Sequence, residues 1–205
     1  MNSDILNPAI YLEHVFKSYE SLSVLQDFSM NFTMETAPGT SSGIYCLMAP
    51  SGAGKTTLFR LIMGLEKPDS GIISLSDHSL RFSAVFQENR LIEHLSPMEN
   101  IMPVMPYKTD KAVIYTELMA LLPEESLTRP VSTLSGGMKR RCSVLRAILA
   151  PSDVVIMDEP FTGLDYDTKN LVIRYLLEHQ DHRLFLIATH DPEDVKKLGA
   201  VTVDL

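Results

Sequence analysis

Apolar residues follow two different periods along this chain, and each period predicts a different element. Near-alternating apolar positions from Ala9 to Phe16 and from Val24 to Met34 are typical of antiparallel strands. Nearly unbroken apolar runs at 44–48, 154–157 and 184–188 are typical of parallel strands that are buried on both faces. Apolar residues at helical spacing follow the first of these runs, at 58, 61, 62 and 65. The pattern therefore predicts an α/β fold with a mostly parallel sheet and an antiparallel part at the N-terminus.

The stretch from about 89 to 150 carries helix signals instead of strand signals. Ser96 to Glu99 form a capping box with proline at the first helical position. A second helix is predicted from about 109 to 122, where Pro123 stops it, and Ser135 is a favourable N-cap for a third. Because we find no internal repeat or linker, we expect one domain over residues 1–205. Its core would span about 1–88 and 151–205, with a helical subdomain inserted at about 89–150.

Composition and charge exclude several classes of protein. Of the 205 residues, 45% are apolar and 21% are charged, as in soluble globular proteins. The net charge of −8 argues against a nucleic-acid partner, so the basic run at 139–141 is expected to be solvated or to contact a protein. No apolar run approaches the roughly 18 residues that span a membrane, and the N-terminus does not resemble a signal peptide. Cys46 and Cys142 are expected to be buried apolar side chains in a reducing cytoplasm.

A glycine-rich turn follows the strand at 44–48, and it predicts a phosphate-binding loop. Converging backbone N–H groups and the dipole of the next helix would attract an anion there. Lys55 would reach the β- and γ-phosphates of a nucleotide, and the Thr56 hydroxyl would hold Mg²⁺. A chance glycine-rich turn is the alternative, expected in on the order of one chain in a hundred of this length. The predicted nucleotide-binding residues are Ser51, Gly52, Ala53, Gly54, Lys55, Thr56 and Thr57.

Polar side chains at the ends of predicted strands indicate the rest of a nucleotide site. Gln87 would face the ligand crevice, and a glutamine on a surface loop is the alternative. Asp158 would steady the metal, while Glu159 would be the general base that activates water. His190 would hydrogen-bond the γ-phosphate, although a lone histidine is more often a satisfied polar residue. Tyr19, in a predicted polar loop, would either stack on a base or have no role.

A second anion site is predicted at the start of the third helix. Ser135 would cap it, and Gly136 and Gly137 would leave bare N–H groups at its positive end. Glycines weaken the first turn of a helix, so a glycine-rich hinge is a serious competing interpretation.

Together these motifs resemble the ATP-binding subunit of an ABC transporter, and the resemblance extends over nearly the whole chain. It implies a P-loop NTPase core that binds ATP and Mg²⁺, with Lys55, Glu159 and His190 in catalysis. The implied metal-binding residues are Thr56, Gln87 and Asp158. The matching motifs are the Walker A loop at 49–57, the Q-loop at Gln87, the signature at 134–138, the Walker B strand end at Asp158 and Glu159, the D-loop at Asp165, the switch histidine at His190 and the adenine-stacking aromatic at Tyr19.

The resemblance also implies partners. Two copies would close head to tail around two ATP molecules, as a homodimer with ATP sandwiched between the subunits. One triphosphate would then touch Lys55 and Thr56 of one copy and the signature residues of the other, Ser135, Gly136 and Gly137. Asp165 would join the nucleotide-binding set. Gln87 and the helical subdomain would pass the motion to a separate transmembrane permease, which would hold the chain on the cytoplasmic face of the cell membrane.

Three departures from the family pattern leave the phosphate, metal and base residues in place. Ala49 and Met138 replace a glycine and a glutamine, and Thr162-Gly163 stands where Ser-Ala is common. Ala49 is compatible with the loop if it needs no positive φ. The segment 86–91 and the compact size most resemble bacterial nitrate, sulfonate and taurine importers. The alternative function is a soluble, non-transport ABC-type ATPase of cluster assembly or cell division.

Overall fold

Two sheets form the framework of the structure, a computed structural model that describes residues 7–20, 22–35, 40–41, 43–50 and 52–205. The larger sheet is parallel, with strand order β5-β6-β7-β3-β8. The smaller sheet is antiparallel, with order β2-β1-β4. Both were predicted. The strands are β1 Ile10–Tyr19, β2 Leu22–Phe32, β3 Ile44–Met48, β4 Ser70–Leu75, β5 Phe82–Val85, β6 Val154–Asp158, β7 Leu184–Ala188 and β8 Val201–Asp204.

The three central parallel strands, β6, β7 and β3, are buried on both faces, which explains their nearly unbroken apolar runs. Successive side chains of a strand point to opposite faces. In β3, Cys46 packs into one apolar core with the helices beyond the sheet. Its neighbours Tyr45 and Leu47 pack into a second core, toward the antiparallel sheet. β6 and β7 divide their apolar side chains in the same way, so every position except Asp158, at the end of β6, carries an apolar residue.

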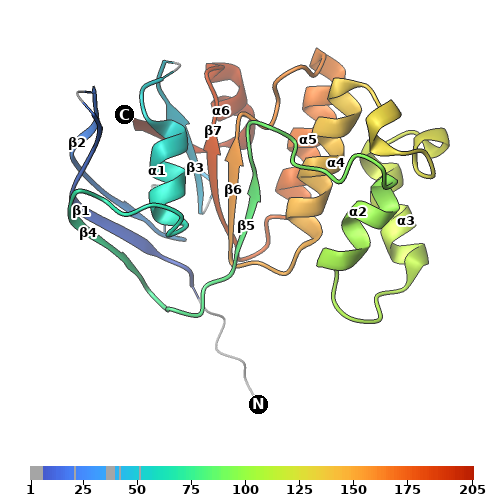
Figure 1. Cartoon of the computed structure of the whole chain (residues 1–205), viewed down its shortest axis with the longest axis horizontal. Helices are drawn as coiled ribbons and strands as arrows, with labels where there is room; N and C mark the ends of the chain where they lie inside the picture. Colours follow the sequence, from blue (N-terminus) through green and yellow to red (C-terminus); the bar gives the residue numbers. More distant parts are fainter. Residues whose placement is uncertain (1–6, 21, 36–39, 42, 51) are drawn as a thin grey trace.

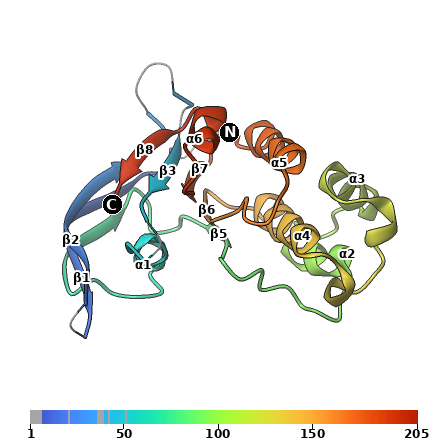
Figure 2. The same ribbon diagram turned by 90° about the horizontal axis from the view of Figure 1, so that it is seen from above.

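The helices lie on both sides of the parallel sheet, as Figures 1 and 2 show. Helix α1 (Lys55–Ile62) packs into the core that faces the antiparallel sheet. Helices α5 (Tyr166–Glu178) and α6 (Pro192–Leu198) contribute to the other core. Because every parallel strand ends on the same edge, the turns after β3, β5, β6 and β7 share one end of the molecule.

Residues 89–150, all of them described, contain helices and no strand, as predicted. The α-helices are α2 (Pro97–Ile101), α3 (Lys111–Leu121) and α4 (Gly136–Leu149), joined by the 3₁₀ helices η1 (Met102–Val104), η2 (Glu124–Ser126) and η3 (Val131–Thr133). The capping box at Ser96 and Glu99 is present. The division of the chain into a core and an inserted subdomain stays a prediction.

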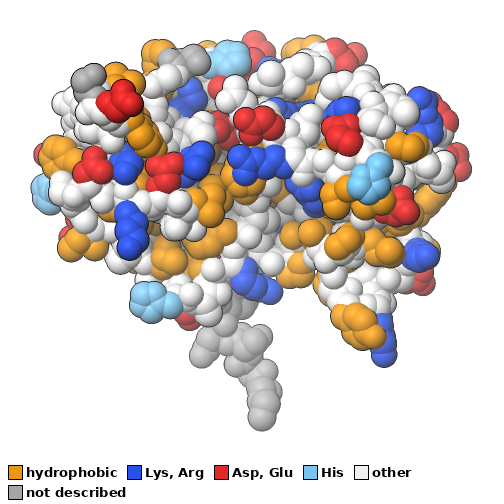
Figure 3. Space-filling model, in the orientation of Figure 1, with side chains coloured by type: hydrophobic (Ala, Val, Ile, Leu, Met, Phe, Trp, Pro, Cys, Tyr) orange, Lys and Arg blue, Asp and Glu red, His pale blue; other side chains and the backbone are white. Residues whose placement is uncertain are grey.

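The surface mixes charges of both signs. Basic and acidic side chains are interspersed on the face in Figure 3, and apolar side chains are visible over α2 and α3. Tyr107, just before α3, is 92% exposed. None of the helices in the described part of the chain is long and apolar enough to cross a membrane.

The structure tests the predictions for the two cysteines and for Tyr19. Cys46 and Cys142 are fully buried, as predicted, and burial raises the pKa of each thiol to about 12. The prediction that Tyr19 lies in a loop is wrong. Tyr19 ends β1 and pairs with Leu22, so the hairpin extends beyond the alternating apolar positions from which the strands were predicted.

Candidate functional site: a nucleotide-binding cavity

The loop between β3 and α1 has the backbone that phosphate binding requires. Gly54 is the N-cap of α1 at φ 101°, and a Cβ there would lie 2.6 Å from Val24 Cγ1. Gly52 also has a positive φ, of 82°. Ala49 does not, so the replacement of the family's glycine leaves the loop unstrained at that position. Ser51, one of the predicted binding residues, lies outside the described residues.

Lys55 is buried and lies against its own loop. Its Nζ donates to the carbonyl oxygens of Ala49 and Pro50, at 2.5 and 3.2 Å. The Ala53 N–H donates to the same Pro50 carbonyl, at 3.2 Å. The ammonium is therefore anchored inside the turn, where a bound triphosphate would compete with the two carbonyl groups for it.

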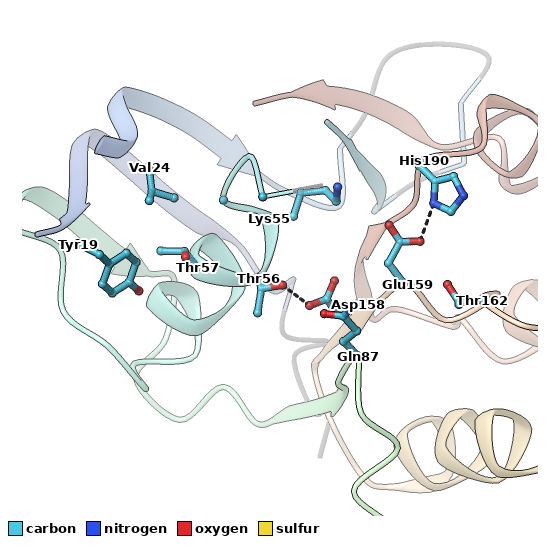
Figure 4. A pocket seen from close by; sticks show the side chains of 12 residues that line it. Tyr19, Val24, Lys55, Thr56, Thr57, Gln87, Asp158, Glu159, Thr162 and His190 are labelled. Atoms are coloured by element: carbon cyan, nitrogen blue, oxygen red, sulfur yellow. Dashed lines mark hydrogen bonds and ion pairs between the residues drawn. The ribbon is translucent and has the colours of Figure 1, made fainter. Parts of the chain in front are cut away.

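Of the two predicted carboxylates, Asp158 ends β6 and Glu159 follows it, and they have different partners. Asp158 is 5% exposed, and its Oδ2 accepts a hydrogen bond from Thr56 Oγ1 at 2.5 Å. Glu159 turns its side chain the other way, so that Oε2 lies 3.0 Å from His190 Nδ1. Figure 4 shows these two pairs side by side in one cavity. An ionised carboxylate can only accept, so with Glu159 ionised this contact requires the His190 tautomer that carries a proton on Nδ1, and Nε2 is left for another group.

The cavity of about 550 Å³ collects residues from five segments of the chain. Its predicted members are Tyr19, Gly52, Gly54, Lys55, Thr56, Thr57, Gln87, Asp158, Glu159 and His190. Two lining residues were missed, Val24 and Thr162. Val24 gave no signal, because an apolar residue of a strand is normally assigned to the core. It is β1–β2 pairing that brings Val24 and Tyr19 to the mouth of the loop.

Tyr19 is held at the edge of this cavity by a hydrogen bond. Its hydroxyl donates to Glu66 Oε2, and Glu66 in turn pairs with Arg60 at 2.6 Å. Partial burial, followed by the hydrogen bond to Glu66, raises the pKa of the Tyr19 hydroxyl. Tyr19 is 42% exposed, so part of the residue remains accessible at the edge of the cavity.

The oxygen atoms near the loop fit a hard divalent cation. Mg²⁺ is usually held by one or two protein oxygens together with phosphate oxygens and water. The Thr56 hydroxyl and the Asp158 carboxylate already meet, and Gln87 lines the same cavity. These three residues, all predicted as metal ligands, are therefore suited to a metal that arrives with a nucleotide.

The predicted second anion site lies in a separate cavity of about 550 Å³. Ser135, Gly136 and Gly137 line it at the start of α4, together with Asp165. Ser135 Oγ caps α4 by accepting from the Met138 N–H at 3.3 Å. Asp165 caps α5 through the Thr168 N–H at 2.9 Å, and hydrogen bonds from Thr168 hold the pKa of Asp165 low. Within one chain, these residues do not line the cavity of Lys55.

The prediction that the basic run at 139–141 is a solvated face or a partner contact is wrong for Arg140. Its side chain is 6% exposed and donates to the carbonyls of Phe86 and Gln87, at 2.7 and 2.5 Å. Arg141 is half-buried and donates to the carbonyls of Gly137 and Leu121. A run of basic residues carries no signal that separates a buried arginine from an exposed one.

Comparisons with known proteins agree with this geometry. A model of the ABC transporter family matches residues 30–162. A curated relative, the spermidine/putrescine import ATP-binding protein PotA of Fusobacterium nucleatum subsp. nucleatum, is 32% identical over 205 aligned residues. The alignment covers 93% of this chain and 53% of the relative, so the chain spans about half the relative's length.

Solved structures show the same fold. The ATP-binding cassette MJ0796, in a dimeric post-hydrolysis state bound to ADP and Pi, matches with a TM-score of 0.78 at 24% identity. That match covers 92% of this chain and 90% of that one. A bacterial Atm1-family ABC exporter with ATP bound matches with a TM-score of 0.75 at 19% identity, over 92% of this chain and 35% of that one. The family model spans more than half of the sequence, and the chain belongs to the ABC transporter family.

Proposed function

We propose that this chain is the ATP-binding and ATP-hydrolysing subunit of an ABC importer. The observation that carries the proposal is the arrangement of two pairs in one cavity. Thr56 meets Asp158 at 2.5 Å, and Glu159 meets His190 at 3.0 Å, beside the loop that holds Lys55. One pair is suited to a nucleotide-bound metal and the other to the activation of water.

The chain's own groups would divide the reaction between them. Lys55 and the loop N–H groups would bind the triphosphate, and Tyr19 would stack on the adenine. Bound Mg²⁺, held through Thr56, Asp158 and Gln87, would neutralise phosphate charge. Glu159 would accept a proton from the attacking water, while the Nδ1–H of His190 fixes the carboxylate.

A dimer would complete the site. Lys55 and Ser135 line different cavities of the same chain, so a single copy offers a triphosphate only one of its two anion sites. Two copies packed head to tail would place the N-terminus of α4 of one against the nucleotide of the other. Two positive helix ends that face one triphosphate give a physical reason for ATP to favour closure.

The proposed permease contact uses the helical segment. Apolar side chains are exposed on it, and Arg140 ties the backbone at Gln87 to α4. A chain bound there to a membrane permease would be peripheral on the cytoplasmic face. The large apolar residues exposed on this segment are Ile92, Met102, Tyr107, Val113, Tyr115 and Met119.

Import is supported by the relative's name, whereas the kind of substrate stays a prediction. The sequence resembles nitrate, sulfonate and taurine importers, but the relative is a spermidine/putrescine import protein. The transported substrate would contact the other chains of the transporter, not this one.

A soluble ABC-type ATPase of cluster assembly or cell division is the alternative function. Co-purification with a very apolar membrane protein supports the importer, and co-purification with soluble partners alone contradicts it.

The substitution Glu159→Gln tests the proposed chemistry. It keeps the size of the side chain but cannot accept the proton, so ATP turnover should fall by roughly 10²–10⁴-fold. ATP affinity, measured by calorimetry, should survive because Lys55, Thr56 and Asp158 are unchanged. Glu178→Gln is the control, since Glu178 is an exposed carboxylate of α5 outside both cavities. Wild-type turnover in Glu159→Gln would show that Glu159 is not the base.

A further inference from the structure

The position of the His190 side chain depends on the backbone around it, because few side chains pack against the exposed imidazole. The side chain is 74% exposed, yet Nδ1 lies 3.0 Å from Glu159 Oε2. Its backbone belongs to the short link between β7 and α6. Thr189, the residue before it, is 2% exposed; its hydroxyl donates to Asp194 Oδ2 at 2.8 Å and accepts from the Asp191 N–H at 3.2 Å. The link is therefore fixed by hydrogen bonds between Thr189, before His190, and two residues that follow it, Asp191 and Asp194.

Lys169 of α5 lies between these two carboxylates. Its Nζ is 2.7 Å from Asp191 Oδ2 and 3.0 Å from Asp194 Oδ1. Burial alone would lower the pKa of Lys169, but the hydrogen bond to Asp191 and the nearby charges of Asp191 and Asp194 raise it. Lys169 is also the main cause of the low pKa of Asp191. Since Asp194 is 1% exposed, loss of the ammonium would leave a buried carboxylate beside a second one of the same charge.

The same lysine belongs to the first turn of a helix that starts in the second cavity. The Lys169 N–H donates to the Asp165 carbonyl at 2.8 Å, and Asp165 lines that cavity. One turn of α5 therefore connects the surface proposed to meet the other copy with the link that carries His190.

We propose that Lys169 is a positioning residue for ATP hydrolysis. By pairing with Asp191 and Asp194, it holds residues 189–191 so that His190 meets Glu159. This inference rests on the proposed function, since it assigns Lys169 to the same reaction. Lys169 does not line the nucleotide cavity, so its loss should affect turnover and not nucleotide affinity.

Kinetics of Lys169→Met test the proposal. We expect kcat to fall roughly 10- to 100-fold, because a displaced catalytic group is costly, with the KM for ATP changed less than about threefold. Lys169→Arg should restore most of kcat. In a His190→Ala background, Lys169→Met should have no further effect, because it acts through His190.

Lys197 offers a matched control. It also joins α6 to α5, since its Nζ donates to Asn170 Oδ1 at 2.8 Å, but it contacts neither carboxylate of the link. Lys197→Met should therefore keep kcat within about twofold of wild type. An equal loss of kcat in Lys197→Met would overturn the proposal. A wild-type kcat in Lys169→Met, or the same fold loss with and without His190, would also overturn it.

A measurement without ATP separates this inference from the proposed function. The ring resonances of His190, assigned by comparison with His190→Ala, can be followed by NMR in the full chain. Lys169→Met should shift them, and Lys197→Met should not. Unchanged resonances in Lys169→Met would overturn the positioning role even in an active enzyme. A wild-type chain without ATPase activity, whose His190 resonances still respond to Lys169→Met, would instead refute the proposed function.

Discussion

Single residues of this chain adopt conformations that no sequence pattern reveals. Glu159 has φ 53°, in the left-handed region that a side chain with a Cβ enters at a cost of about 1–2 kcal/mol. Its N–H donates to the Ala188 carbonyl at 3.1 Å, which ties the turn to β7. The backbone reverses there, so Glu159 faces His190 while the preceding Asp158 faces Thr56. Adjacent carboxylates thereby acquire different partners.

Tyr19 gives a prediction at this scale. Tyr19→Ala should weaken ATP binding by about 1–3 kcal/mol, because it removes the stacking surface. Tyr19→Phe keeps the ring and loses only the hydrogen bond to Glu66, so its effect should be small. Calorimetry with ATP measures both. Tyr107→Ala is the control, since Tyr107 is 92% exposed and lies outside the nucleotide cavity. Equal affinities for the wild type and both Tyr19 variants would remove Tyr19 from the site.

Among the elements, α3 and α5 are joined by a cluster far from the nucleotide cavity. Tyr175 of α5 is 4% exposed, and its hydroxyl donates to Glu117 Oε2 of α3 at 2.6 Å. The His179 ring stacks on the Tyr175 ring with 4.0 Å between the ring centroids, and His179 Nε2 lies 3.3 Å from the same Glu117 oxygen. Burial, and then the bond to Glu117, raises the pKa of the Tyr175 hydroxyl. The cluster joins the helical segment to α5, the helix that Asp165 caps.

We expect this cluster to contribute measurably to stability. Tyr175→Phe removes a buried hydrogen bond to a carboxylate, so the free energy of unfolding should fall by about 1.5–3 kcal/mol in urea denaturation. Tyr115→Phe is a matched control on α3. Its hydroxyl donates to Glu124 at 2.5 Å, but the side chain is 38% exposed, so the loss should stay below about 1 kcal/mol. Equal decreases in the free energy of unfolding in the two variants would show that the hydrogen bond between Tyr175 and Glu117 stabilises the protein no more than an exposed one does.

Over the whole molecule, the two cavities are the feature that matters most for function. Thr162 borders both, while the glycine-rich loop lines one and the start of α4 lines the other. One chain can therefore offer its P-loop to one nucleotide and its signature residues to another. This arrangement suits a pair of chains related head to tail.

The dimer itself can be tested with hydrolysis blocked. Glu159→Gln should accumulate as an ATP-dependent dimer on size-exclusion chromatography, since the bridging triphosphate persists. Addition of Ser135→Arg should abolish that dimer by filling the second cavity, and ATP binding by the monomer should remain. Ser132→Arg, at an exposed position outside that cavity, should leave the dimer intact. If Glu159→Gln alone stays monomeric with ATP at every protein concentration tested, the prediction that two isolated chains close around ATP is contradicted.

Local chemistry made much of this protein predictable from its sequence. The central strands β3, β6 and β7 were found because both of their faces are buried, so nearly every position in them is apolar. The starts of α2 and α4 were found because capping acts within three residues. The glycine-rich loop was predicted from its own motif, and Asp158, Glu159 and His190 were predicted because they follow parallel strands, whose ends meet at one edge of the sheet. The structure brings all of them to one cavity.

Contacts between distant residues could be decided only by the tertiary structure. Arg140 is buried because carbonyls more than 50 positions away accept its hydrogen bonds. Val24 and Tyr19 reach the nucleotide cavity through the pairing of β1 with β2, whose register no motif encodes. Lys169 meets Asp191 across 22 positions, where helix spacing predicts nothing. Periodicity and capping are short-range effects that can be read along the chain, whereas the partner of a buried charge depends on which elements the folded core brings together.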